Sequence, residues 1–61
     1  MTFTAEEKYK AAMREVGQRR KVYPNIIMRG NMTREQADYQ IAVMEAIAAD
    51  YEELAKKERL I

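Results

Sequence analysis

The sequence predicts an all-α protein, a helical hairpin of two main helices with a short helical elbow. Two stretches of the chain carry apolar residues every three or four positions, the spacing of an amphipathic helix. Each stretch follows a threonine that has Glu or Gln three residues later, the spacing of a capping box. The only proline, Pro24, and one of the two glycines lie between the stretches. We expect main helices at about residues 5–21 and 34–59 and the elbow at about 24–29, within a single domain of residues 1–61.

The first helix is predicted to begin just after Thr4. Glu7 completes its capping box, and acidic residues in the first turn suit the positive end of the helix dipole. One face carries an apolar stripe made of Ala5, Tyr9, Ala12, Met13 and Val16. Gly17 costs about 1 kcal/mol relative to alanine inside a helix, so it is either a tolerated weak point or the site of a close helix crossing.

The elbow is predicted from Pro24 and Gly30. Proline disfavours a helical conformation in the residue before it, so the first helix should end near residue 21. Pro24 suits the first position of a new short helix, because its missing N–H would be unpaired there in any case. Gly30 should end that helix, since glycine readily takes the left-handed conformation that closes helices.

The last helix is predicted to begin after Thr33, which forms a second capping box with Gln36. Over residues 34–59 it would be about 39 Å long. Its apolar residues form a heptad seam with a 4-3-4-3-4 spacing, namely Ala37, Ile41, Met44, Ala48, Tyr51 and Ala55. Ile47 and Leu54 lie beside the seam and widen it, and such a wide stripe favours a helical bundle over a two-stranded coil.

The same pattern predicts a homodimer. A first helix of about 26 Å cannot cover the whole of the last helix, so apolar residues near the far end stay exposed in a monomer. The chain lacks the cysteines and histidines that stabilise many small domains through disulfides or zinc. We therefore expect two hairpins to pair into a four-helix bundle, with a dimer interface made of Ile47, Tyr51 and Leu54.

Charge is distributed unevenly along the chain. The net charge is +1, yet residues 14–34 hold six basic residues and one acidic residue, while residues 35–61 hold seven acidic and three basic residues. Such asymmetry indicates either an anionic partner or two antiparallel subunits that charge holds in register.

The basic and apolar residues around the elbow are the candidate binding surface for a protein or a nucleic acid. Guanidinium groups bind phosphates bidentately, and a tyrosine ring offers a stacking face for a base. The apolar residues of the same segment are equally suited to docking another protein. The predicted surface consists of Arg19, Arg20, Lys21, Tyr23, Ile26, Ile27, Arg29 and Arg34.

Composition argues against an enzyme. The chain has no His, Cys, Ser or Trp, so the usual nucleophiles and the usual base are missing. We expect no catalytic residue, no metal site and no cofactor. The beginning of the chain has no signal-peptide pattern, and its apolar runs are far shorter than the ~20 residues that cross a bilayer. We expect no membrane association and a cytoplasmic location.

The segment from Arg20 to Thr33, continued by Glu35-Gln36-Ala37 and by residues 41–47, resembles a group of small helical proteins encoded by phages and prophages. The shared pattern is a basic residue, Val-Tyr-Pro, an apolar pair, a glycine, then Met-Thr and a Glu-x-Ala helix start. The resemblance covers about residues 19–51. It implies a phage origin, hence the cytoplasm of a host cell, and no particular activity.

Three hypotheses for function follow. The first is a non-enzymatic protein-interaction module, phage-encoded if the resemblance holds, that acts on a host or phage protein. The second is a weak nucleic-acid-binding protein that uses the basic elbow, whose affinity would fall steeply as salt rises. The third is a purely structural subunit whose only partner is a second copy of itself.

Overall fold

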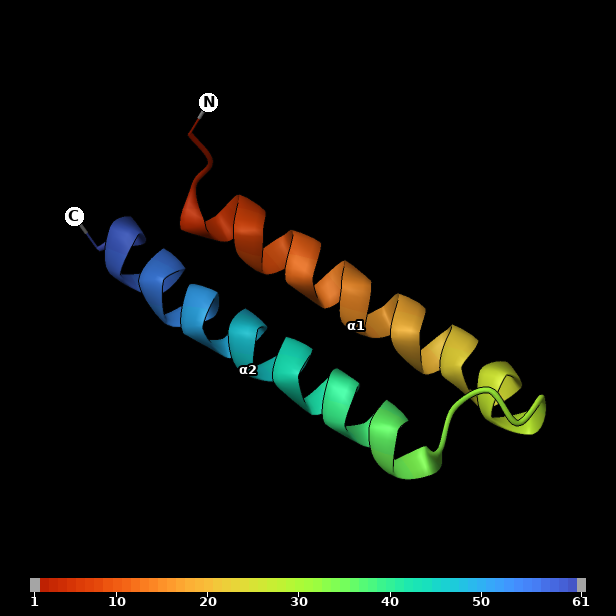
Figure 1. The fold of residues 1–61 in the computed structure, drawn as a ribbon. Helices are drawn as coiled ribbons and strands as arrows, with labels where there is room; N and C mark the ends of the chain where they lie inside the picture. The colour runs from red at the N-terminus through yellow and green to blue at the C-terminus, as the bar shows by residue number, and fades with distance from the viewer. Residues whose placement is uncertain (1, 61) are drawn as a thin grey trace.

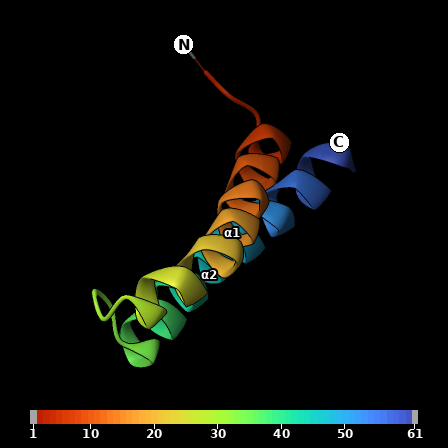
Figure 2. The ribbon, with the colours of Figure 1, turned by 90° about the vertical axis from the view of Figure 1, so that its right-hand side faces the viewer.

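The computed structural model describes residues 2–60, and over that range the chain forms a hairpin of two helices. The first, α1 (Ala5–Met28), and the second, α2 (Arg34–Arg59), lie side by side and antiparallel along their lengths (Figure 1). The view turned by 90° shows the two helices stacked one over the other (Figure 2). Within the described residues there is no strand, and the predicted all-α hairpin is confirmed.

Both predicted capping boxes are present. The hydroxyl of Thr4 accepts a hydrogen bond from the Glu7 N–H at 3.1 Å, and the Glu7 carboxylate accepts one from the Thr4 N–H at 3.2 Å. Thr33 and Gln36 form the same pair of bonds, at 3.1 and 3.0 Å. Each box satisfies backbone donors that the first turn of a helix leaves without partners, and so fixes where α1 and α2 begin.

The prediction of a separate elbow helix is wrong. Across residues 2–60, α1 does not end near residue 21 but continues through Pro24 to Met28. A proline inside a helix costs about 3 kcal/mol through one lost hydrogen bond and a clash of its ring with the preceding turn, and the ring of Pro24 is exposed to solvent. Beyond it, Ile26 and Ile27 are half-buried, so packing against α2 outweighs the local preference for a helix break.

Gly30, which was predicted to end the elbow helix, instead follows the end of α1. Its φ of 79° is in the left-handed region, where glycine is favoured over residues with a Cβ. The Gly30 N–H donates to the Ile27 carbonyl at 3.0 Å, and the Asn31 N–H donates to the Ile26 carbonyl at 3.2 Å. These bonds satisfy carbonyls at the end of α1 and turn the chain towards α2.

Because α1 continues to Met28, it is longer than the sequence predicted, and this changes how much of α2 it covers. With 24 residues in α1 and 26 in α2, the helices are about 36 and 39 Å long, so they match in length. The expectation that α1 leaves the far end of α2 uncovered is therefore wrong. Tyr51 is half-buried against α1, and the Lys8 ammonium lies 5.4 Å from the centre of its ring.

The core of the hairpin is built from small side chains. Larger seam residues such as Tyr9, Ile41 and Met44 are only half-buried. A Cβ added at Gly17 would meet no heavy atom of the described chain within 4 Å, so this glycine is a weak point of α1 and not a close helix crossing. Among the described residues, those that are fully buried are Ala5, Ala12, Val16, Ala37, Ala48 and Ala55.

Candidate interaction surfaces

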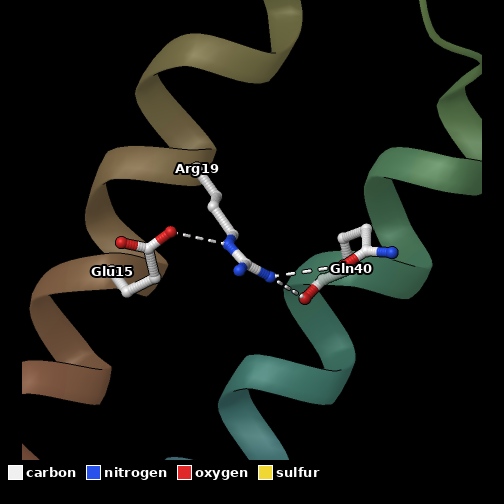
Figure 3. A network of polar contacts seen from close by, with 3 residues as sticks. All are labelled: Glu15, Arg19 and Gln40. Atoms are coloured by element: carbon white, nitrogen blue, oxygen red, sulfur yellow. Dashed lines mark hydrogen bonds and ion pairs between the residues drawn. The ribbon is translucent and has the colours of Figure 1, made fainter.

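Two neighbouring arginines mark the two long sides of the hairpin. Arg19 donates from Nη1 to the Gln40 carbonyl oxygen at 2.9 Å, and its Nε contacts the Glu15 carboxylate at 2.9 Å (Figure 3). Arg20 instead pairs with Glu45, with 2.6 Å between Nη2 and Oε2. Consecutive residues of a helix point about 100° apart, so the two arginines reach α2 on opposite sides. We call these sides the Arg19 flank and the Arg20 flank.

The Arg20 flank of α2 is acidic. Asp38, Glu45 and Glu52 follow each other at intervals of seven residues and so share this side of the helix. The carboxylate of Glu52 acts on the hydroxyl of Tyr9 on this flank and raises the pKa of Tyr9. The flank therefore joins basic or polar residues of α1 to an acidic row of α2.

At the loop end of the Arg20 flank the surface is hollowed into a groove of about 340 Å³. Most of its lining is apolar, and its charged members are Arg20, Arg34 and Asp38. Met28, at 85% exposure, borders it near the loop. The full lining is Arg20, Tyr23, Pro24, Ile27, Met28, Arg34, Ala37, Asp38 and Ile41.

The Arg19 flank of α2 is apolar. Val43, Ile47 and Leu54 lie three, seven and fourteen residues after Gln40, which places them in one row on this side. Their exposed fractions are 38%, 37% and 46%. We call these three residues the apolar row. Its members are exposed because they lie beside the seam, and not because α1 is too short.

The Arg19 flank of α1 carries charged and small residues. Glu15 lies four residues before Arg19, Lys8 lies seven before Glu15, and Val22 lies three after Arg19. Val22 is 44% exposed and lines a shallow hollow together with Glu15 and Arg19. Lys8 lines a second hollow near the beginning of α1, beside Ala11.

The structure separates the residues of the predicted elbow surface. Arg20, Tyr23, Ile27 and Arg34 line the groove, and Tyr23 also borders the hollow beside Arg19. The other members of the predicted set lie apart from the groove: Arg19 on the opposite flank, Lys21 and Arg29 exposed, and Ile26 half-buried.

The three residues of the predicted dimer interface lie in two different places. Ile47 and Leu54 share the apolar row, whereas Tyr51 lies in the seam of the hairpin under Lys8. Sequence reasoning missed Val43 as a member of the row. The signal was present, because Val43 precedes Ile47 by four residues.

Other kinds of site receive no support from the described part of the chain. Across residues 2–60 there is no group of three or more acidic side chains placed to hold a metal ion. Over the same residues, neither helix has the length and apolar character needed to cross a membrane.

Comparisons with protein-family models, with curated proteins and with solved structures find no match to this chain.

Proposed function

We propose that this chain is a non-enzymatic protein-interaction module that works as a homodimer, with two hairpins paired through their Arg19 flanks into a four-helix bundle. In such a dimer the groove on the Arg20 flank stays accessible to another protein. The proposal depends above all on one observation, the large surface that a single hairpin leaves exposed.

The hairpin alone buries too little of itself. It exposes 5072 Å², whereas a compact monomer of 7.2 kDa would expose about 4,100 Å². The difference of about 950 Å² is close to the ~800 Å² that each partner contributes to a standard protein interface. The shape agrees, because the radius of gyration is 14.2 Å while a globular chain of this length would have about 10.5 Å.

The residues favour the Arg19 flank as the paired side. Burying the acidic row of the Arg20 flank would remove Asp38, Glu45 and Glu52 from water at a large cost. Burying the apolar row removes Val43, Ile47 and Leu54 from water, which is favourable by about 25 cal/mol for each Å² of apolar surface.

The arrangement favours a protein partner over a nucleic acid. Arg19 and Arg20, the centre of the predicted basic surface, are both bound to carboxylates of this chain. A phosphate group would have to displace Glu15 and Glu45 to reach them. The groove, in contrast, offers the mostly apolar lining with a few charged residues that is typical of a protein-docking site.

The test is the molecular mass of the chain in solution, measured by sedimentation equilibrium. We expect twice the 7.2 kDa of one chain, and we expect Leu54→Glu to give the monomer mass, because it places a charge in the apolar row. Ala42→Glu is the matched control, since Ala42 is exposed on the side of α2 that faces away from α1. A wild-type monomer, or a dimer that Leu54→Glu leaves intact, would contradict the proposed interface.

A further inference from the structure

The contacts between α1 and α2 fix how the two helices match along their lengths. Lys8 lies over Tyr51, and Arg19 bonds to Gln40, so each step forward along α1 corresponds to one step back along α2. By this register Ala11 lies level with the buried Ala48, and the buried Ala12 lies level with Ile47.

The two ends of the apolar row lie symmetrically about a point close to that level. Val43 and Leu54 lie equally far on either side of a point between Ala48 and Ala49, and Ile47 lies next to that point. A two-fold axis perpendicular to the helices at this level would place Val43 of one copy opposite Leu54 of the other. Each exposed end of the row would then be covered by the other end of the same row.

The same axis has a consequence for α1. By the register of the hairpin it passes between Lys10 and Ala11, within about 1.5 Å of the midpoint between Lys8 and Glu15. Lys8 of one copy then lies two residues, or about 3 Å, from the level of Glu15 of the other. The two long side chains can span this offset, and symmetry repeats the pair. The small, exposed side chain of Ala11 next to the axis allows the two copies of α1 to approach each other closely.

We infer that the dimer is built about this axis, with the two loops at opposite ends and with Lys8 of each copy paired to Glu15 of the other. This geometry rests on the proposed function, since it assumes a homodimer paired through the Arg19 flanks, and it adds how the two copies are oriented. The alternative, with both loops at the same end, would lay α2 of one copy along α1 of the other. Ile47 and Leu54 would then lie against the charged side chains of Lys8 and Glu15.

Charge exchange tests the pairing. We expect Lys8→Glu and Glu15→Lys each to weaken dimerisation by about tenfold, because each creates two like-charge contacts. The double variant should return to within about threefold of the wild type. Contacts within one chain cannot explain a recovery of dimerisation by the double variant. The Lys8–Tyr51 and Glu15–Arg19 contacts are lost in the double variant as they are in the single variants. Lys10→Glu, an exposed charge change on the side of α1 that faces away from α2, is the control and should change nothing.

A distance between the loops tests the axis. The chain has no cysteine, so Asn31→Cys provides a single attachment site for a spin label in each copy. Loops at opposite ends would hold the two labels about 50 Å apart, while loops at the same end would bring them to about 15 Å. A short distance, or a double variant as weak as the single ones, would overturn this geometry and leave the dimer standing. The absence of any interchain signal would overturn the proposed function itself.

Discussion

Interaction of the Tyr9 hydroxyl with the carboxylate of Glu52 raises the pKa of Tyr9 above its usual value of 10.0. The neutral phenol can donate a hydrogen bond, whereas the ionised phenol would be repelled by the carboxylate. Because the pKa is higher in the folded chain than in the unfolded chain, the contact stabilises the fold below pH 10 and is lost as the pH rises through the folded-state pKa.

Glu52→Gln is therefore expected to lower the pKa of Tyr9 towards 10.0, since it removes both the charge and the strong acceptor. The measurement is an ultraviolet titration of tyrosinate, in which the difference between each protein and its Tyr9→Phe variant isolates this residue. A Tyr9 pKa that is the same in the wild type and in the Glu52→Gln variant would show that the two side chains do not interact.

Single residues also show what local sequence signals can predict. Thr4 and Thr33 were recognisable as helix caps because the capping box needs only residues three positions apart. Gly30 was recognisable as a helix end because glycine alone takes the left-handed conformation at low cost, which is also a local property of the sequence. The pairing of Arg20 with Glu45 joins residues 25 positions apart, and no local pattern indicates it.

At the scale of a helix, the two glycines give opposite predictions. Gly17 lies inside α1 with open space around it, so Gly17→Ala should stabilise the fold by about 1 kcal/mol through better helix propensity. Gly30 has a φ of 79°, so Gly30→Ala should destabilise the fold by about 1 kcal/mol. Chemical denaturation measures both, and each variant is the control for the other. If the two substitutions changed the free energy of unfolding by the same amount and in the same direction, the backbone conformation of each glycine would not determine the change in stability.

The beginning and end of α2 could be predicted because the cap, the seam and the basic last turn all agree. The end of α1 could not. The rule for proline is local, while the partial burial of Ile26 and Ile27, which follows from the folded hairpin, is not visible in the local sequence. The error at Pro24 then affected the dimer interface, since a shorter α1 would have left Tyr51 uncovered. Ile47 and Leu54 are exposed as predicted, but for another reason, since they lie beside the seam and not beyond the end of α1.

At the scale of the whole molecule, the thin core predicts that stability depends on protein concentration. Six small residues are fully buried among those described, and the larger apolar side chains keep part of their surface in water. If pairing of two hairpins buries that surface, association draws the equilibrium towards the folded state, and it does so more strongly as the concentration rises.

A hundredfold increase in concentration should stabilise each chain of a dimer by about 1.4 kcal/mol, which corresponds to a rise of about 5–10 °C in Tm. Thermal unfolding followed by far-ultraviolet circular dichroism at several concentrations measures this directly. Leu54→Glu should lower Tm and make it independent of concentration, because the variant cannot bury the apolar row. Ala42→Glu should keep the concentration dependence of the wild type. A wild-type Tm that does not change with concentration would mean that the hairpin folds alone, and that its small core suffices without a second copy.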